Sequence, residues 1–316
     1  MPFIYLLSTD EQDAELAQAE LRALAGCHAS GRVGIGPVAC DISRSAYVRT
    51  CAEIIAHGQS LDELCAEVAG VGLSSDGFRI DVHKLPPRPA EHGMDVARRI
   101  ADCMRGWPDL SRPRERFAAI CCRNDWWLAR TISTGVRGDL AQQGRPRNLS
   151  QALSARHARA LVNLVAAPGD TLLDPCCGCG TCLIEARHMG IRAWGSDIAL
   201  ANAFAARENL LHFGMPPAVA VADARTVRGQ WDAVVIDFPY GHTTHPSEGL
   251  YEDVLNNLAP RALRIAVILG ERGERLFERC GLEVTDLARV RGNTLVRHFY
   301  VLKGRRAPGP ALSRQE

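Results

Sequence analysis

Apolar and polar residues alternate in blocks along the second half of the chain. Short apolar runs expected as strands lie at residues 171–175, 192–197, 218–222, 231–236 and 264–269, with helical spacing of apolar positions between them. Two further runs, 282–291 and 295–302, follow each other directly. This alternation predicts a doubly wound, mostly parallel sheet that ends in an antiparallel pair.

The first 130 residues combine strand and helix patterns in a different order. Strands are expected at residues 3–7 and 77–85, a helix between Ser60 and Gly70, and a hairpin over 116–131 that contains adjacent tryptophans, Trp126 and Trp127. Because hairpin side chains alternate between faces, at least one of these indoles should belong to the core, while the other could stack on RNA. This part is therefore predicted to be a separate α+β region.

Two segments lack an apolar period. Residues 133–149 are rich in glycine, proline, arginine and polar residues, which is typical of a linker, and the tail 304–316 is expected to be disordered. At 316 residues the chain is long enough for two domains with cores of their own. No apolar run is long enough for a bilayer span and the start does not resemble a signal peptide, so a cytoplasmic location without membrane contact is expected.

Charge is distributed unevenly along the chain. Residues 1–83 carry 5 basic and 12 acidic side chains, a balance of −7, whereas residues 84–147 carry 13 and 7, a balance of +6. All basic residues except Lys84 and Lys303 are arginines. Arginine binds phosphate with two parallel hydrogen bonds and stacks on bases, so the basic segment suggests a nucleic-acid partner.

Four predicted strands end in an aspartate, namely Asp174, Asp197, Asp223 and Asp237. Ligands of open α/β sheets bind outside the carboxyl ends of the strands, so these side chains should meet in one crevice. Asp197 suits a ribose diol, and the glycines that follow Asp174 allow the backbone to approach a ligand. The residues expected to bind the cofactor are Asp174, Cys176, Gly178, Gly180, Thr181, Asp197, Ile198, Asp223, Ala224 and Asp237.

A dinucleotide is the alternative ligand for this crevice. Its G-x-G-x-x-G fingerprint is incomplete here, because Leu183 occupies the third glycine position. Asp174 would also repel a pyrophosphate, whereas it could hold the cationic amino-acid end of S-adenosylmethionine. S-adenosylmethionine is therefore the expected cofactor.

The stretch Asp237-Phe238-Pro239-Tyr240 carries the expected chemistry. An exocyclic amine of a base is a poor nucleophile, because its lone pair is delocalised into the ring. A carboxylate and a nearby backbone carbonyl can accept the two amine hydrogens while an aromatic ring stacks on the base, which aims the nitrogen lone pair at the methyl group. Asp237, Phe238, Pro239 and Tyr240 are the predicted catalytic residues.

Four cysteines, Cys176, Cys177, Cys179 and Cys182, crowd the first strand-to-helix turn. Their overlapping C-x2-C spacings resemble part of an iron–sulfur run, but a second separated pair, as zinc sites use, is missing. Cys176 and Cys177 would also leave the strand in opposite directions. No metal site is predicted.

Residues 150–302 resemble Rossmann-type amino-methyltransferases. The motifs "DTLLDPCCGCGTCLIEA", "GSDIALANAFAARENL", "DFPYG" and "RGNTLVRHFYVL" are similar to those of THUMP-domain tRNA guanine-N2 methyltransferases, and "GFRIDVHKL" with the hairpin is similar to a THUMP domain. The family usually has two prolines after the acid, and here Phe238 occupies the first of these positions.

The resemblance implies a Rossmann-like seven-stranded methyltransferase domain preceded by an α+β ferredoxin-like and THUMP region. The implied divisions are a ferredoxin-like segment, an RNA-binding THUMP-like domain, a linker, a methyltransferase domain and a tail, at residues 1–55, 56–132, 133–149, 150–303 and 304–316. The implied reaction is methylation of N2 of a tRNA guanosine, with guanosine 10 expected. tRNA is the expected partner, and a small activating subunit is left open. Two alternatives remain: an amino-methyltransferase of another RNA or of DNA, and an RNA-binding protein with a decayed catalytic site.

Overall fold

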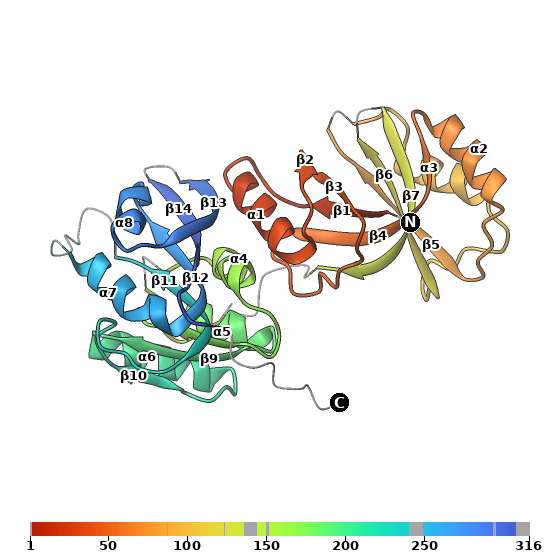
Figure 1. Cartoon of the computed structure of the whole chain (residues 1–316). Helices are drawn as coiled ribbons and strands as arrows, with labels where there is room; N and C mark the ends of the chain where they lie inside the picture. The colour runs from red at the N-terminus through yellow and green to blue at the C-terminus, as the bar shows by residue number, and fades with distance from the viewer. Residues whose placement is uncertain are drawn as a thin grey trace. The chain divides into compact units, whose positions relative to one another are not determined.

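The computed structural model divides into two compact units, each built on one seven-stranded sheet (Figure 1). The first unit comprises Met1–Ser8 and Leu24–Val136, and the second comprises Thr9–Ala23 and Arg137–Glu316. Among the described residues, no helix is long and apolar enough to cross a membrane. The structure describes residues 2–86, 88–122, 124–135, 144–149, 152–239, 249–292 and 295–307.

The described residues of the first unit form the strands β1 (Phe3–Leu7), β2 (Ala29–Ser30), β3 (Val33–Gly36), β4 (Val48–Gly58), β5 (Phe78–Lys84), β6 (Glu115–Cys122) and β7 (Asp125–Thr134), and the helices α2 (Leu61–Val71) and α3 (Gly93–Ala101). The strand order is β2-β3-β1-β4-β7-β6-β5, and β5 and β6 form the parallel pair. Helices α2 and α3 bury their apolar residues against one face of β5, β6 and β7. The hairpin predicted from the sequence is the antiparallel pair β6–β7.

Strand β4 runs across the boundary predicted at residue 55. It pairs with β1 on one side and with β7 on the other, so segments 1–55 and 56–132 share one continuous sheet. Trp126 and Trp127 are both buried, on opposite faces of this sheet, which leaves neither of them free to stack on RNA. The assignment of the two segments to ferredoxin-like and THUMP folds stays a prediction.

The second unit confirms the predicted Rossmann-like sheet. Its order is β10-β9-β8-β11-β12-β14-β13, parallel from β10 to β12 and antiparallel at β14 and β13. The strands are β8 (Thr171–Asp174), β9 (Arg192–Asp197), β10 (Val219–Val221), β11 (Trp231–Asp237), β12 (Ala262–Leu269), β13 (Glu283–Arg291) and β14 (Val296–Lys303). The helices are α1 (Ala14–Ala25), α4 (Ala155–Val165), α5 (Thr181–His188), α6 (Leu200–His212), α7 (Leu250–Leu258), η1 (Ala259–Arg261) and α8 (Glu274–Arg279).

Helix α1 packs on the second unit as far as Ala23, although the sequence assigned it to the segment 1–55. Asn163 of α4 donates to the buried carboxylate of Glu20 over 2.7 Å, and His157 of α4 lies 2.9 Å from Asp13. The physical reason is that α1 buries polar side chains whose partners lie on α4. No local pattern in residues 9–23 reveals those partners.

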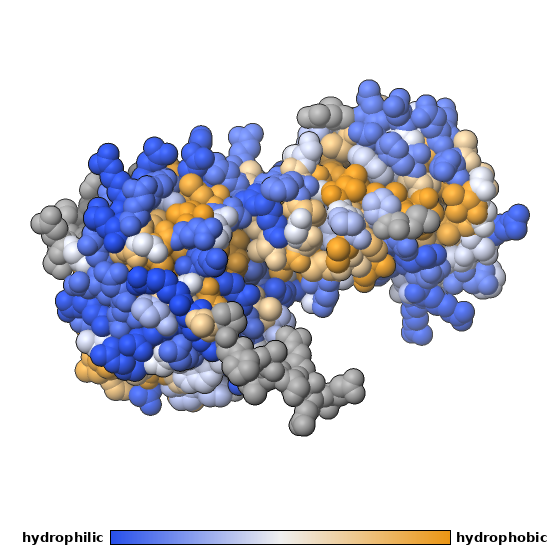
Figure 2. Space-filling view, in the orientation of Figure 1, coloured by the Kyte–Doolittle hydropathy of each residue, from blue (hydrophilic) through white to orange (hydrophobic). Residues whose placement is uncertain are grey.

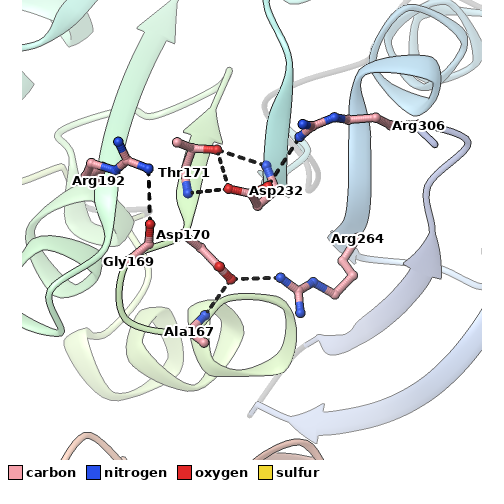
Figure 3. Close-up of polar contacts among 8 residues, drawn as sticks. All are labelled: Ala167, Gly169, Asp170, Thr171, Arg192, Asp232, Arg264 and Arg306. Atoms are coloured by element: carbon pink, nitrogen blue, oxygen red, sulfur yellow. Dashed lines mark hydrogen bonds and ion pairs between the residues drawn. The ribbon is translucent and has the colours of Figure 1, made fainter. Parts of the chain in front are cut away.

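A polar network ties together the amino ends of the parallel strands (Figure 3). Asp232 of β11 accepts hydrogen bonds from the Thr171 amide and hydroxyl at 2.9 and 2.7 Å, and Arg264 of β12 pairs with Asp170 at 2.7 Å. Arg306 contacts Asp232 at 3.3 Å. Residues 304–307 of the predicted disordered tail are thus described and attached to the sheet, because their backbone amides also bond to the β12 region. The remainder of the tail lies outside the described residues.

Apolar side chains are also exposed on the second unit. Leu200, Phe204 and Leu211 of α6 are all more than half exposed, as is Val221 of the edge strand β10. Figure 2 shows apolar, orange surface at the lower edge of this unit, where Figure 1 places α6 and β10.

Candidate functional site: an acidic cavity at the strand ends

A cavity of about 800 Å³ opens at the carboxyl ends of the parallel strands, on the opposite edge from the network of Figure 3. It brings together residues from the ends of β8, β9 and β11 and from the loop after β10. Tyr240 lies outside the described residues. The predicted site residues that line the cavity are Asp174, Cys176, Gly178, Thr181, Asp197, Ile198, Asp223, Ala224, Asp237, Phe238 and Pro239.

The turn between β8 and α5 is held by backbone hydrogen bonds. The Cys177 amide donates to the Ser196 carbonyl of β9, and the Gly178 amide donates to Asp197 Oδ2, each over 2.9 Å. These bonds link the first and second strand ends directly. The glycine-rich turn is therefore shaped partly by the acid at the next strand end.

Gly180 differs from the prediction, because it does not line the cavity. It has φ of +85° at the start of α5, and a Cβ there would lie 3.2 Å from the Ala206 Cβ of α6. Its missing side chain therefore allows the turn and the close packing of two helices, and its role in cofactor binding stays a prediction.

Asp197 is held rigidly by the chain. Its Oδ1 accepts from the Ala199 amide at 2.9 Å and from Asn202 Nδ2 at 3.2 Å, while Oδ2 accepts from Gly178. A carboxylate offers about four acceptor positions, so one position on Oδ2 remains for a ligand. Asn202, which was not among the predicted site residues, lines the cavity and orients this acid.

Asp223 is paired with Arg225, which the sequence did not single out. The guanidinium donates to Oδ2 through Nη2 and Nε, at 2.5 and 2.9 Å, and Nε also lies 3.1 Å from Oδ1, which accepts from the Arg225 amide at 2.9 Å. The hydrogen bonds from Arg225 lower the pKa of Asp223. Both residues line the cavity.

The D-F-P segment is braced by α7. The Phe238 ring is 2% exposed and packs on the Tyr251 ring, with 4.3 Å between ring centroids. The Tyr251 hydroxyl donates to the Pro239 carbonyl over 2.5 Å. The aromatic residue in the place of the usual proline therefore packs against a ring from the following helix.

Asp174 is a buried acid with other acids nearby. Its pKa is raised to about 8, chiefly by burial and also by the charges of Asp237 and Asp197, while a hydrogen bond from the Cys176 amide opposes the rise. A neutral or negative ligand cannot relieve this repulsion, whereas a cation can. The cavity therefore favours a ligand with positive charge.

Three of the four turn cysteines have a raised pKa, which favours the thiol form. Burial is the main cause that raises the pKa of Cys176, Cys177 and Cys182 far above the ordinary value, and a thiolate is the form that binds metal. In the part of the chain that the structure describes, no group of three His, Cys, Asp or Glu side chains could hold a metal ion.

Two arginines before α4 contact α5 and α6. Arg145 donates to the Thr181 hydroxyl over 2.9 Å, and Arg147 pairs with Glu208 at 2.5 Å. Leu149 of the same segment lines the cavity. The described end of the predicted linker, residues 144–149, therefore contacts α5 and α6 and contributes Leu149 to the cavity wall.

Residues 142–291 match the model of the RMKL-like methyltransferase domain family. A tRNA (guanine(10)-N2)-dimethyltransferase of Methanothermobacter thermautotrophicus is 28% identical over 92% of this chain and 99% of its own length. A probable tRNA (guanine(10)-N2)-dimethyltransferase of Methanothermococcus thermolithotrophicus is 34% identical over 32% of this chain and 69% of its own length.

Among solved structures, TrmN from Thermus thermophilus matches with a TM-score of 0.50 and 19% identity, over 96% of this chain and all of that one. This similarity supports the fold over both units. With the family match over the cavity-bearing strands and the two relatives, it leads to one assignment. The chain belongs to the THUMP-type tRNA guanine-N2 methyltransferase family.

Proposed function

We propose that this protein transfers a methyl group from S-adenosylmethionine to the exocyclic N2 amine of guanosine 10 in tRNA. The observation that carries the proposal is the position of Asp237, Phe238 and Pro239 on the same cavity as Asp174 and Asp197. We also propose that the reaction takes place in the cytoplasm.

The residues of the cavity fit S-adenosylmethionine, which carries an ammonium and a sulfonium cation. Asp174 would hold the ammonium end, the remaining acceptor position of Asp197 would take a ribose hydroxyl, and Ile198 and Asp223 would border the adenine. When bound, the cofactor supplies the methyl group.

The chain's own contribution is to position the guanine amine. Asp237 and the Phe238 carbonyl would accept its two hydrogens, with Tyr240 predicted to stack on the base. Fixing the amine in one orientation removes the entropic cost of alignment, which is a large part of such barriers. Arg297 of β14 is a half-buried cation that also lines the cavity.

Labelled methyl transfer into unmodified tRNA tests the proposal. Asp237→Ala should reduce transfer by about 10²-fold or more while the affinity for S-adenosylmethionine changes little. Asp232→Asn is the matched control, since Asp232 lies on the same strand at the end away from the cavity, in the network of Figure 3. It should keep wild-type transfer.

A tRNA with adenosine at position 10 should accept no label, and ribosomal RNA and DNA test the alternative substrates. Cofactor binding without transfer to any tRNA would contradict the proposal and favour an RNA-binding protein with a decayed site.

A further inference from the structure

The first unit exposes a tryptophan on the loop between α3 and β6. Trp107 is 60% exposed and Leu110 is 69% exposed, whereas Trp126 and Trp127 of the same unit are at most 9% exposed. Trp107 and Leu110 both belong to the segment of residues 105–114, the 105–114 loop. An indole that shows most of its surface to solvent is uncommon, because its burial is favourable.

The backbone of the 105–114 loop is fixed along β5. The Gly77 amide donates to the Trp107 carbonyl over 2.9 Å, the Asp109 amide donates to the Phe78 carbonyl over 2.8 Å, and the Arg114 amide donates to the Gly77 carbonyl over 2.7 Å. The exposed indole is therefore presented from an ordered backbone. Little conformational entropy would be lost when a ligand binds to it.

The same loop carries positive charge. Arg105, Arg112 and Arg114 are exposed, and none of them has a carboxylate partner among the described residues. The acid of the loop, Asp109, instead accepts hydrogen bonds from the amides of Ser111 and Arg112 and from the Ser111 hydroxyl, each at 2.9 Å. The three guanidinium groups are therefore available to an anion.

Two neighbouring arginines are less available to an anion, because they pair with a carboxylate. Arg79 and Arg116 both pair with Asp81, at 2.8 and 3.1 Å. Arg79 Nη1 also donates to the Leu110 carbonyl over 3.3 Å, which ties the end of the loop to β5. Arg79 therefore supports the loop and Arg116 is paired on β6, while Arg105, Arg112 and Arg114 carry the loop's positive charge.

A flat aromatic surface beside unpaired guanidinium groups is suited to single-stranded nucleic acid. Stacking of one base on an aromatic side chain contributes about 1–3 kcal/mol, and it requires a base whose face is not covered by a neighbour in a duplex. Guanidinium groups bind the phosphates with paired hydrogen bonds.

We propose that the 105–114 loop binds unpaired nucleotides of the substrate RNA, with one base stacked on Trp107 and the phosphates bound by Arg105, Arg112 and Arg114. This inference rests on the proposed function in so far as the substrate is RNA. It assigns the contact to a defined loop of the first unit, separate from the methylation cavity.

Binding of a fluorescently labelled single-stranded oligoribonucleotide to the full-length chain tests the inference, with the duplex of the same sequence as a second probe. Trp107→Ala should weaken single-strand binding about tenfold or more, as the loss of one stacked base implies, and leave duplex binding nearly unchanged. Trp107→Phe should restore most of the affinity. Phe204→Ala, which removes an exposed ring from α6, is the matched control and should have no effect.

Arg112→Ala should reduce the slope of log affinity against log salt by about 0.7, the value for one phosphate contact on a single strand. Unchanged binding by Trp107→Ala would overturn the inference, and so would an equal loss for single strand and duplex. Displacement of the RNA by a poly-glutamate peptide that also depends on Trp107 would indicate a protein partner instead. Methyl transfer by the wild type is measured separately. If the wild type transfers no methyl group but Trp107→Ala still weakens RNA binding, the proposed function is refuted and this inference stands.

Discussion

At the scale of single residues, Asp174 shows how a binding site opposes stability. It is 4% exposed at the end of β8, and it lies near two other carboxylates that line the same cavity. Removing a carboxylate from water and placing it beside like charges costs free energy unless a cation is present. This destabilising arrangement lies where a cationic ligand is expected to bind.

The first prediction concerns Asp174→Asn. The pKa of Asp174 is about 8 in the folded chain and 3.8 as the ordinary value, so the folded state retains a proton that the unfolded state loses. The stability of the wild type should therefore fall as the pH rises from about 4 to about 8, and Asn at this position should remove that fall. Thermal unfolding at pH 5 and pH 8 measures it, and the variant's gain in Tm should be larger at pH 8, by about 4 °C or more.

The same variant should lose affinity for S-adenosylmethionine at both pH values, which calorimetry can measure. If the difference in Tm between Asp174→Asn and the wild type were the same at pH 5 and pH 8, Asp174 would be ionised in the folded, ligand-free protein.

The second prediction concerns the Tyr251 hydroxyl, which donates to the Pro239 carbonyl. Tyr251→Phe removes this bond but keeps the ring that packs on Phe238. On the proposed function, kcat should fall about tenfold, because the loop that holds the target amine becomes less well fixed, while KM for tRNA and the Tm stay close to wild type. Tyr251→Ala should lower the Tm as well. An unchanged kcat in Tyr251→Phe would limit Tyr251 to a packing role.

At the scale of elements, α1 shows where sequence patterns mislead. The helix extends over Ala14–Ala25 and buries Leu16, Ala17 and Leu21. The spacing of these apolar residues does not determine which sheet they pack on, since any apolar surface could cover them. Two polar contacts attach α1 to the second unit: the buried hydrogen bond between Asn163 and Glu20, and the ion pair of Arg22 and Asp286 at 2.6 Å.

The third prediction follows from this pair. Glu20→Ala removes the buried hydrogen bond from Asn163 to Glu20, which should cost about 1–3 kcal/mol of unfolding free energy. Hydrogen exchange should increase in α4 and leave β5 to β7 of the first unit unaffected. Glu11→Ala, an exposed acid three residues before α1, is the control and should change neither measurement. Equal loss of protection in both units would contradict the assignment of α1.

The elements of the second unit were predicted closely, and those of the first were predicted less completely. Strands β8, β9 and β11 lie within one residue of the expected runs, because buried parallel strands are continuous apolar runs with clear ends. Strands β3 and β4 were not predicted. The sequence of β4 mixes arginine, threonine, glutamate and histidine with apolar residues, and its pairing with β1 and β7 rather than its apolar pattern makes it a strand.

At the scale of the whole molecule, the chain passes between the two units three times, after Ser8, after Ala23 and after Val136. Each unit has a sheet and a core of its own. The proposed cofactor site lies entirely within the second unit, so a ligand there stabilises one of the two cores directly.

The fourth prediction is that S-adenosylhomocysteine, at about 100 times its dissociation constant, stabilises the second unit by about 2.7 kcal/mol. Hydrogen exchange should show the added protection in β8 to β12 and α4 to α7, with much less change in β5 to β7. Asp174→Asn should abolish the effect. Equal protection of both units would show that they unfold as one cooperative body.

The sequence by itself determined the parallel sheet, the four acids at its strand ends and the chemistry expected of D-F-P-Y, because strand periodicity and strand-end residues are local features. Only the tertiary structure decided that Gly180 serves helix packing, that Tyr251 braces Phe238 and Pro239, that α1 belongs to the second unit, and that Trp107 and not Trp126 or Trp127 is exposed. Each of these depends on which distant surface a side chain meets. Packing between residues far apart in the chain determines which surfaces meet, and a short stretch of sequence does not show it.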